Sequence, residues 1–422
     1  MRCVVLAAGK GTRLSPLCET RPKPLIPIGG RPILEHLLLA LRENDIHDVL
    51  VVVGYLAESI KSRFKDGSHL GIRVQYARQR RLLGTADALA TSKNFVQKDD
   101  FLVVNGDMFV SPEAIRPLLD SDYVHENVIA IARVDNVEDY GVVLLKEDRV
   151  ERLAEKPTGR MSSPWVNAGI YRMNETALDF LRDVPYSPRG ELELTDVFNA
   201  LINLDHRILA AKIDARDWMD IGRPHDLLEA NERALEGIDR KIDGKLERGT
   251  HLHGPIILAR GAKVRSGAYI EGPVYIGEES DIGPNCHLRP YTSLGRETRV
   301  GNACEIKNSN IFGQSHIGHL SYVGDSILGE GCNLGAGTVT ANLRFDDSNV
   351  KVRIKSKLCD TGRRKFGVVM GDGVKTGVNV STMPGIKIGH NSWIGPNATV
   401  TRDVEPNTLM IQRADYETSS IE

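Results

Sequence analysis

Residues 258–294, LARGAKVRSGAYIEGPVYIGEESDIGPNCHLRPYTSL, carry an aliphatic side chain at every sixth position. The same period runs on to Phe312, shortens to five at Ile317 and Leu328, and returns in a second register over 370–400. A six-residue aliphatic repeat is typical of a parallel β-helix, in which each hexapeptide supplies one short strand and one inward side chain. We therefore predict a left-handed β-helix of hexapeptide repeats over residues 245–422.

One segment interrupts this repeat. Residues 341–369, ANLRFDDSNVKVRIKSKLCDTGRRKFGVV, lack the period and are rich in lysine and arginine. Insertions in a repeat protein project from one face, which is often the binding face. The plain alternative is a solvated loop, and the sequence leaves both interpretations open.

The first 222 residues follow a different pattern, in which apolar runs alternate with amphipathic stretches. Continuous Val/Ile/Leu runs indicate strands covered on both faces, as in a mainly parallel sheet flanked by helices. Helices are expected at 33–46 and 111–121. We therefore predict an α/β, Rossmann-like domain over 1–222, with its ligand at the carboxyl ends of the strands. The six expected strands are CVVLAAG, DVLVVVG, IRVQYA, FLVVNGD, VIAIARV and ILAAKI.

A single amphipathic helix is expected between the two domains. Residues 223–240, RPHDLLEANERALEGIDR, place apolar side chains at the 3.6-residue period. We assign 223–244 as a linker that contains this helix.

Composition excludes several classes of function. The 422 residues hold 54 basic and 56 acidic side chains, a balance that favours neither nucleic acid nor a membrane as partner. No apolar run approaches the ~20 residues that span a bilayer, and the N-terminal stretch does not resemble a signal peptide. The six cysteines show no CxxC pair, so we expect reduced, mostly buried thiols in a cytoplasmic protein.

The segment 3–27, CVVLAAGKGTRLSPLCETRPKPLIP, predicts a phosphate site. Gly9, Gly11 and Thr12 allow backbone N–H groups to approach a phosphate closely, and Arg13 adds a forked donor. The loop fits neither the dinucleotide fingerprint nor the P-loop, which needs a lysine directly after its glycines. Lys23, held between two prolines on a stiff segment, is the candidate for that missing charge.

LAAGKGTRL followed by RPKPLIP resembles the signature of sugar-1-phosphate nucleotidylyltransferases, which join a nucleoside triphosphate to a sugar 1-phosphate and release pyrophosphate. The resemblance implies Arg13 and Lys23 as catalytic residues and Mg²⁺ held by Asp107 and Asp220. It also implies two sets of binding residues. The nucleotide would be bound by Leu6, Ala8, Gly9, Gly11, Thr12, Gln79, Gly84 and Thr85, and the sugar by Asp107, Gly141, Glu155, Lys156, Asn167 and Glu191.

Such a reaction needs positioning and charge neutralisation more than covalent catalysis. A sugar phosphate oxygen would attack the α-phosphorus in line, while Arg13 and Lys23 neutralise the α-phosphate and the leaving pyrophosphate. Two carboxylates at strand ends suit a magnesium ion that bridges the reacting phosphates.

The β-helix also carries candidate site residues. Arg289 and Lys307 are 18 residues apart, or three hexapeptides, so they should stack on one face and form an anion pocket. His319 and Tyr322 lie beside a shortened repeat, and an imidazole, whose unperturbed pKa is near ~6.5, suits proton removal from an attacking amine at neutral pH. Cys332 has no evident base partner and is not expected to be a nucleophile.

These segments resemble the acetyltransferase half of bifunctional N-acetylglucosamine-1-phosphate uridylyltransferase/glucosamine-1-phosphate acetyltransferases, and the chain looks most like an archaeal version. The resemblance implies His319 as base for direct attack of the sugar amine on acetyl-CoA. A tyrosine usually follows the amine-orienting asparagine, whereas Leu343 stands here and the insertion follows at once. Sugar and acetyl-CoA binding would fall to Arg289, Lys307, Tyr322, Asn333, Ala336, Asn342 and Lys351.

Two alternatives remain at this stage. The β-helix of a one-reaction nucleotidylyltransferase would serve only assembly or regulation, and a non-enzymatic scaffold would not need the intact loop, Lys23 and Asp107. The resemblance implies a homotrimer with acetyltransferase sites between subunits. The sequence does not decide between UTP and dTTP, nor which sugar 1-phosphate is preferred.

Overall fold

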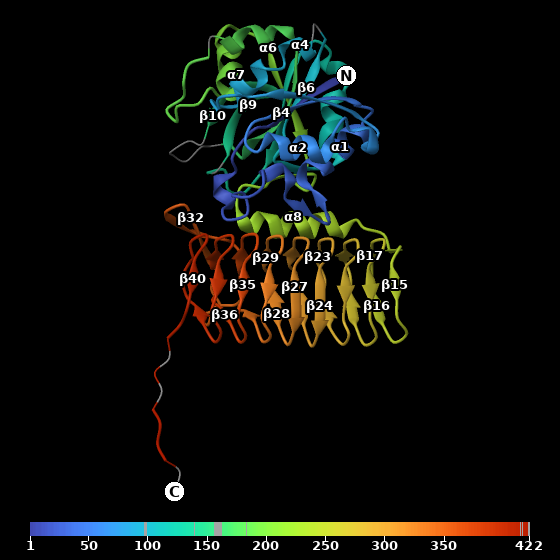
Figure 1. Cartoon of the computed structure of the whole chain (residues 1–422). Helices are drawn as coiled ribbons and strands as arrows, with labels where there is room; N and C mark the ends of the chain where they lie inside the picture. The colour runs from blue at the N-terminus through green and yellow to red at the C-terminus, as the bar shows by residue number, and fades with distance from the viewer. Residues whose placement is uncertain are drawn as a thin grey trace. The chain divides into compact units, whose positions relative to one another are not determined.

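We describe the chain from a computed structural model, which covers residues 1–96, 99–138, 140–155, 163–182, 184–413, 415 and 417–420. The chain forms two compact units, and each is described by itself (Figure 1). Unit 1 holds Met1–Lys10, Arg21–Ile26 and Pro32–Ile221, whereas unit 2 holds Gly11–Thr20, Pro27–Arg31 and Gly222–Glu422. The division by contacts therefore assigns two short N-terminal segments to the second unit.

Unit 1 is built on a nine-stranded sheet. Strands β5, β4, β1 and β6 are mutually parallel, and β12 is parallel to β8. β11 runs antiparallel to both β6 and β8, and β9 and β10 form an antiparallel pair. The six strands expected from the sequence are present, and these three antiparallel strands are additional. The order is β5 (Arg73–Arg78), β4 (Asp48–Val53), β1 (Arg2–Ala7), β6 (Phe101–Asn105), β11 (Trp165–Met173), β8 (Asn127–Arg133), β12 (Ile208–Ile213), β10 (Arg149–Glu155) and β9 (Gly141–Lys146).

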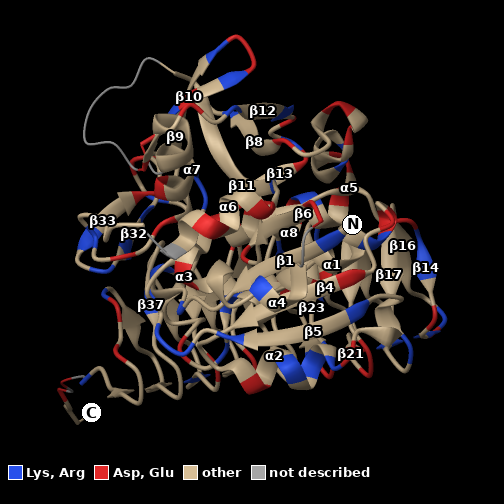
Figure 2. Ribbon diagram, turned by 90° about the horizontal axis from the view of Figure 1, so that it is seen from above, with Lys and Arg blue, Asp and Glu red and all other residues tan. Residues whose placement is uncertain are grey.

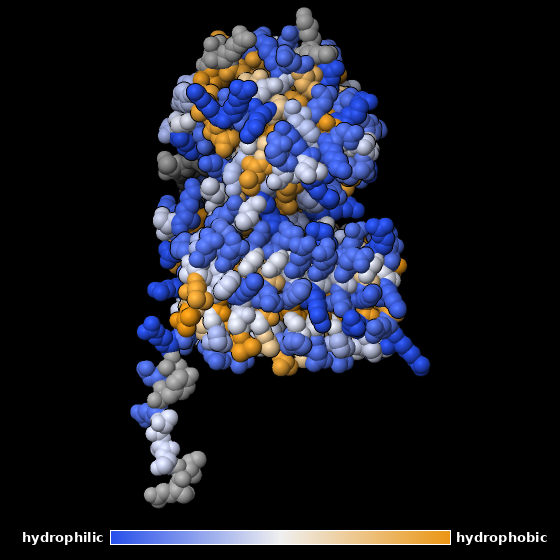
Figure 3. Space-filling model, in the orientation of Figure 1, coloured by the Kyte–Doolittle hydropathy of each residue, from blue (hydrophilic) through white to orange (hydrophobic). Residues whose placement is uncertain are grey.

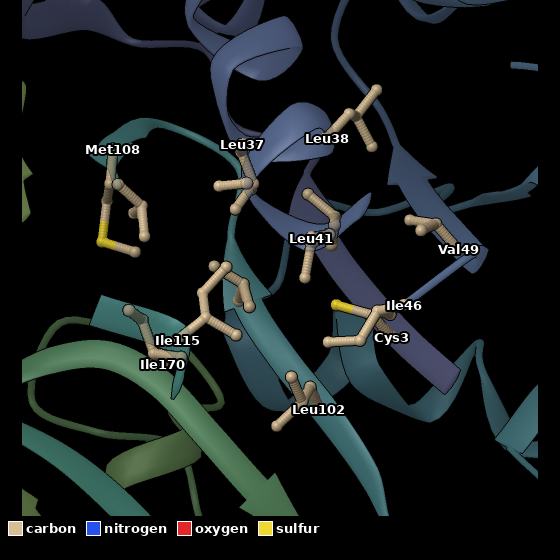
Figure 4. Packing of buried hydrophobic residues seen from close by; sticks show 14 of the residues in the cluster. Cys3, Leu37, Leu38, Leu41, Ile46, Val49, Leu102, Met108, Ile115 and Ile170 are labelled. Carbon is tan, nitrogen blue, oxygen red and sulfur yellow. The ribbon is translucent and has the colours of Figure 1, made fainter. Parts of the chain in front are cut away.

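Helices cover this sheet with apolar faces. Leu37, Leu38 and Leu41 of α1 point into a fully buried cluster with Cys3 of β1 and Val49 of β4 (Figure 4). The helix expected at 111–121 is divided, because a proline at 117 lacks the N–H that would continue it: α5 is followed by a 3-10 helix at Arg116–Leu119. The α-helices of unit 1 are α1 (Ile33–Glu43), α2 (Ala57–Phe64), α3 (Thr85–Ala90), α4 (Lys93–Val96), α5 (Pro112–Ile115), α6 (Glu175–Asp179) and α7 (Leu194–Asn203).

The Gly222–Glu422 segment of unit 2 begins with the expected amphipathic helix, α8, which spans Pro224–Glu236. It starts at a proline in the first turn and ends at Gly237, so it is shorter than the predicted 223–240. Among the residues that the structure describes, none of the helices is both long and apolar enough to cross a bilayer.

The rest of unit 2 is a left-handed parallel β-helix with three sheets, all of parallel strands. The first sheet contains β14 (Lys241–Ile242), β17 (Ile256–Leu258), β20 (Val274–Ile276), β23 (Thr292–Leu294), β26 (Asn310–Ile311), β29 (Ile327–Leu328), β34 (Val369–Met370) and β37 (Lys387–Ile388). The second contains β15 (Lys245–Leu246), β18 (Lys263–Val264), β21 (Asp281–Ile282), β24 (Arg299–Asn302), β27 (His316–His319), β30 (Asn333–Leu334), β35 (Lys375–Thr376), β38 (Trp393–Ile394) and β40 (Leu409–Met410). The third contains β16 (His251–His253), β19 (Tyr269–Glu271), β22 (His287–Leu288), β25 (Glu305–Lys307), β28 (Tyr322–Gly324), β31 (Val339–Thr340), β36 (Ser381–Thr382) and β39 (Thr399–Val400).

The register of these strands follows the repeat, with one correction. Leu294 pairs with Ile311, not with Phe312, so the first five-residue step comes at Ile311. Phe312 is buried as well, which made the two positions indistinguishable by hydrophobicity alone. The second short step, at Leu328, is as expected, because Ile311 pairs with Leu328. Figure 3 shows that the face of the β-helix turned toward the viewer is mainly hydrophilic, which agrees with apolar side chains pointing inward.

The insertion at 341–369 contains an antiparallel hairpin of β32 (Lys351–Ile354) and β33 (Lys357–Asp360). Its base is closed where Leu343 bridges Lys365. Lys and Arg colour the hairpin blue in Figure 2, and Phe345 before it is fully exposed.

Candidate active sites

A lysine between two aspartates is the charged centre of unit 1. Lys23 opens a 3-10 helix after Pro22 and is only 5 % exposed. Its Nζ lies 2.8 Å from Asp107 Oδ2 and 3.8 Å from Asp220 Oδ1. Asp107 follows β6, and Asp220 ends β13 (Trp218–Asp220), which pairs with β7 (Met108–Val110). The pairing of two short strands thus brings together carboxylates that are far apart in sequence.

This arrangement fits a magnesium site. Two carboxylates face one ammonium group, so the negative charge exceeds the positive. The described residues contain no group of three or more His, Cys, Asp or Glu that could hold a metal by themselves. Mg²⁺ is commonly bound by one or two carboxylates, with water and phosphate oxygens completing the shell. Asp107 and Asp220 therefore suit a metal that arrives with a phosphate ligand.

The end of β1 is fixed by bonds to its neighbours. Leu6 O accepts from Gly106 N at 2.8 Å, and Ala8 O accepts from Tyr55 N at 3.0 Å. Gly9 follows and is exposed. A Cβ added at Gly9 would meet no atom within 4 Å, so the fold itself does not require glycine there. That open space is what close approach of a phosphate needs.

The next three residues of the loop form a tight turn. Gly11 has a left-handed conformation with φ of 63° and precedes a 3-10 helix at Thr12–Leu14. Thr12 is exposed and Arg13 is half-buried. In the described part of the chain, the Arg13 guanidinium has no hydrogen-bond or ion-pair partner, so all its donors are available to a ligand.

Gln79 is a buried polar side chain whose amide oxygen has no hydrogen-bond partner among the described residues. Its Nε2 donates to Gly84 O at 2.9 Å and to Asp87 Oδ2 at 2.7 Å. A carboxylate can only accept, so Asp87 fixes which end of the amide is the nitrogen. Gln79 Oε1 is therefore directed elsewhere and can accept a hydrogen bond from a ligand.

Gly84 and Thr85, both expected to bind the nucleotide, contact the chain just after Glu191, which is expected to bind the sugar. Gly84 has φ of 121°, and a Cβ there would lie 2.4 Å from Leu192 O. Thr85 Oγ1 accepts from Leu194 N at 2.8 Å. Thr85 thus has a structural bond, and its role in nucleotide binding stays a prediction.

The expected sugar residues lie on β9, β10 and β11. Gly141 pairs with Glu155, and a Cβ on Gly141 would lie 3.6 Å from Asn167 Cβ. Glu155 Oε1 accepts from Arg189 Nη2 at 3.2 Å. Three of the expected residues therefore meet at one end of the β9–β10 hairpin.

The remaining sugar residues are less closely placed. Asn167 donates to the Tyr171 hydroxyl at 2.8 Å and accepts from Gly169 N at 2.9 Å. Burial raises the pKa of Tyr171. Glu191 is exposed, and Lys156 lies outside the described residues.

In unit 2, both expected phosphate-binding cations are paired with carboxylates. Arg289 Nη1 lies 2.8 Å from Glu305 Oε1, and Lys307 Nζ lies 3.1 Å from Asp325 Oδ2. Arg289 and Lys307 share a face, as their spacing predicts, because β22 pairs with β25. Each positive charge is compensated, so the pocket has less net positive charge than the sequence suggested.

Tyr322 and Asn342 complete this cluster. Asn342 Nδ2 donates to the Tyr322 hydroxyl at 3.2 Å and to Asp325 Oδ2 at 2.5 Å. Tyr322 lies beside Glu305 in the β25–β28 register. Burial is the main cause that raises the pKa of Tyr322, and the charges of Asp325 and Glu305 add to it.

Four expected residues lie apart from the cluster. His319 ends β27 in the second sheet, is exposed, and its ring has no partner among the described residues. Its carbonyl accepts from Gly337 N, next to Ala336. Asn333 begins β30 beside His316, and Lys351 is exposed on the insertion hairpin. Among the described residues, no side-chain hydrogen bond or ion pair joins these four to Tyr322 or Lys307.

Comparison with known proteins places these two sites in a family. A family model described as nucleotidyl transferase matches residues 2–237, and one described as the GMPPB C-terminal domain matches residues 270–380. "Bifunctional protein GlmU" of Methanococcus maripaludis strain C7 is 48 % identical over 98 % of both chains. A "bifunctional sugar-1-phosphate nucleotidylyltransferase/acetyltransferase" of Sulfurisphaera tokodaii is 40 % identical over 96 % of this chain and 98 % of its own. The chain belongs to this bifunctional nucleotidylyltransferase/acetyltransferase family.

Other similarities agree with this assignment. The GlmU protein of Methanocaldococcus jannaschii is 42 % identical over 98 % of both chains. A solved structure of a putative glucose-1-phosphate thymidylyltransferase from Bacillus anthracis has a TM-score of 0.51 and 27 % identity. It covers 57 % of this chain and 97 % of its own, so it matches little more than one half of the bifunctional protein. The archaeal-type bifunctional resemblance is thereby confirmed.

Sequence reasoning missed one carboxylate of the second site, Asp325. Acidic residues are common in the turns of a β-helix, so this one did not stand out. Its signal is the coil length: Asp325 is 18 residues after Lys307 and 17 before Asn342, one coil in each direction.

Proposed function

We propose that this bifunctional enzyme makes a nucleotide-activated N-acetyl amino sugar in two steps. Acetyl-CoA first acetylates the amine of glucosamine 1-phosphate, and the product then reacts with UTP, or with dTTP, to release pyrophosphate. The observation that carries the proposal is the presence of two separate polar centres, one at Lys23 in unit 1 and one at Tyr322 and Asn342 in unit 2.

The nucleotidylyl step needs charge neutralisation at the phosphates. Lys23 is rigid, buried and already positioned by two carboxylates, so it needs little reorganisation to meet a phosphate oxygen. Arg13 offers its unpaired guanidinium to the triphosphate. Asp107 and Asp220 would hold Mg²⁺, which when bound supplies positive charge to the reacting phosphates. Gln79 would accept from the pyrimidine through its free Oε1, with Gly9, Gly11 and Thr12 lining the phosphates.

The acetyl step needs an acceptor for one proton. The sugar amine attacks the thioester carbon, its C–N bond forms as the C–S bond breaks, and His319 takes the amine proton. The same imidazolium can return that proton to the departing coenzyme A thiolate. Lys307, Arg289 and Tyr322 would hold the sugar phosphate, Asn342 would orient the amine, and Asn333, Ala336 and Lys351 would meet the coenzyme.

A homotrimer would bring these groups together. His319 lies on the second sheet and Tyr322 on the third, and no hydrogen bond joins their side chains among the described residues. Packing of copies through flat β-helix faces would let one subunit supply the base and the other the sugar site. All six cysteines are free thiols, which supports a cytoplasmic location.

The product identifies the function. Purified protein with Mg²⁺, acetyl-CoA, glucosamine 1-phosphate and equal UTP and dTTP is expected to give a UDP- or dTDP-N-acetyl sugar by mass spectrometry. Galactosamine 1-phosphate in place of the glucosamine sugar defines the sugar preference. Formation of nucleotide sugar only from pre-acetylated or neutral sugars would reduce the β-helix to an assembly module.

A further inference from the structure

Asp325 is a buried carboxylate that the proposed mechanism does not use. It lies in the turn after β28 with a left-handed φ of 48°, and its side chain is 3 % exposed. It accepts from Lys307 Nζ at 3.1 and 3.3 Å, from Asn342 Nδ2 at 2.5 Å and from Asn308 Nδ2 at 2.9 Å. A charge this deeply buried is costly unless it is paired and hydrogen-bonded, and three donors from the two neighbouring coils, Lys307 and Asn308 on one side and Asn342 on the other, meet that need.

Asp325 determines which atom Asn342 can offer to a substrate. A carboxylate only accepts, so the amide nitrogen must face Asp325. That nitrogen also donates to the Tyr322 hydroxyl. Asn342 Oδ1 has no partner in the described part of the chain and is left to accept an N–H of the sugar amine. Tyr322, acting as acceptor here, keeps its own hydrogen for a phosphate oxygen.

Further hydrogen bonds and an ion pair hold Asp325 and Asn342 in place. Asn308 Nδ2, which donates to Asp325, also donates to Glu232 Oε1 of α8 at 2.9 Å. Glu232 pairs closely with Arg363 at the base of the basic insertion. The insertion closes on the site itself, because Phe366 N donates to Asn342 O at 2.9 Å. The helix, the turn and the insertion therefore converge on one asparagine, and all of them belong to unit 2.

We propose that Asp325 is a positioning residue for acetyl transfer, and that Arg363, Glu232 and Asn308 hold it in place. Asp325 fixes the acceptor orientation of Asn342 and the position of the Lys307 ammonium. The insertion, which replaces a short segment of the repeat, thereby supports the amino-sugar site and is more than a solvated loop. This inference rests on the proposed acetyl transfer.

The test is Asp325→Asn, which keeps the shape and removes the charge. The amide can then present a hydrogen where a lone pair is needed, and the site loses its fixed geometry. We expect kcat/KM for glucosamine 1-phosphate to fall about 100-fold, as for a small displacement of a positioned group. The KM for acetyl-CoA and pyrophosphorolysis in unit 1 should not change. Asp281→Asn is the matched control, because Asp281 is a β-helix carboxylate paired with Arg265 outside this cluster.

A double-mutant cycle separates positioning from simple stability. Because Asp325 also holds Lys307, Asp325→Asn should still lower activity in the Asn342→Ala background, but by at most about 10-fold, against about 100-fold in the wild type. Losses that multiply would overturn the inference. Should Asp325→Asn fail to fold, Glu232→Gln decides, with an expected loss of roughly 10-fold; unchanged acetyl transfer would contradict the proposal. Wild-type protein without any acetyl transfer would instead contradict the proposed function.

Discussion

Lys23 is the central positive charge of the first site. Its ammonium is almost fully buried and satisfied by Asp107 and, at longer range, by Asp220. Removing it would leave Asp107 and Asp220 without the cation that both of them face. Carboxylates that share a site repel each other, and a divalent cation relieves the repulsion.

Lys23→Ala is therefore expected to make stability depend on magnesium. Pyrophosphorolysis of a nucleotide sugar should fall at least 100-fold, the scale of losing one oriented charge. The melting temperature of unit 1 should rise more with Mg²⁺ in the variant than in the wild type, as calorimetry would show. The Asp107→Asn variant, with one carboxylate removed, serves as control and should lose this response. Equal shifts in all three proteins would contradict the shared site.

Tyr322 gives a prediction about pH. Burial, with the nearby charges of Asp325 and Glu305, raises its pKa above the ordinary value of 10.0, although the Asn342 bond and Arg289 act in the opposite direction. A raised pKa keeps the phenol neutral at higher pH, so the hydroxyl remains a donor throughout the neutral and mildly alkaline range. The ultraviolet difference between wild type and Tyr322→Phe should titrate above pH 10. A transition below that value would contradict this environment.

The residues of the sites were only partly predictable. Lys23, Asp107 and Asp220 could each be recognised in their motifs, because a glycine-rich loop and strand ends restrict where phosphates and metals bind. The two aspartates meet at the Lys23 ammonium because β7 pairs with β13, and no local sequence pattern predicts that pairing. Asp325 belongs to no recognisable motif. Its partners Lys307 and Asn342 are each one coil away, so only the length of a coil could have indicated that the three residues meet.

At the scale of elements, the two glycines of the nucleotide site have different reasons to be glycine. Gly84 has φ of 121° and no room for a Cβ against Leu192 O. Gly9 has ample room. The fold therefore requires glycine at position 84, and we propose that the ligand requires it at position 9.

Alanine at each position tests this distinction. Gly84→Ala should destabilise unit 1 by about 2 kcal/mol, seen as a loss of roughly 4–8 °C in melting temperature. Gly9→Ala should melt like the wild type but raise the KM for the nucleoside triphosphate about 10-fold, because a methyl group keeps the phosphate off the backbone. A destabilised Gly9→Ala protein would show that the loop is structural.

The elements themselves were predictable where a period exists. Alternating apolar runs gave six strands of the sheet, and the six-residue repeat gave the β-helix. The hairpin β9–β10 and the strand β11 escaped notice because their faces alternate less clearly. The first short step of the repeat was expected one repeat too late, at Ile317 instead of Ile311, because Ile311 and Phe312 are both buried. The insertion lacks any period, so its hairpin and closed base could not be read.

At the scale of the whole molecule, the accessibility of the cysteine thiols is a measure of how tightly the chain is packed. Five of the six cysteines are buried, and only Cys359, on the insertion hairpin, is partly exposed. Burial raises the pKa of Cys286 to about 12 and also raises that of Cys3, so neither forms a reactive thiolate near neutral pH. One thiol per native chain should react rapidly with a disulfide reagent, and six in denaturant. Loss of the fast thiol in Cys359→Ser is the control, and several fast thiols would contradict the packing.

The central claim is that one chain holds two independent active sites. The most direct measurement follows release of coenzyme A and of pyrophosphate by the same preparation, at catalytic enzyme concentration, with glucosamine 1-phosphate, acetyl-CoA, UTP and dTTP. For the individual half-reactions, His319→Ala is expected to abolish coenzyme A release and keep nucleotidylyl transfer to N-acetylglucosamine 1-phosphate. Asp107→Asn is expected to do the reverse. Loss of both activities in either variant, or wild type that never releases coenzyme A, would contradict the account.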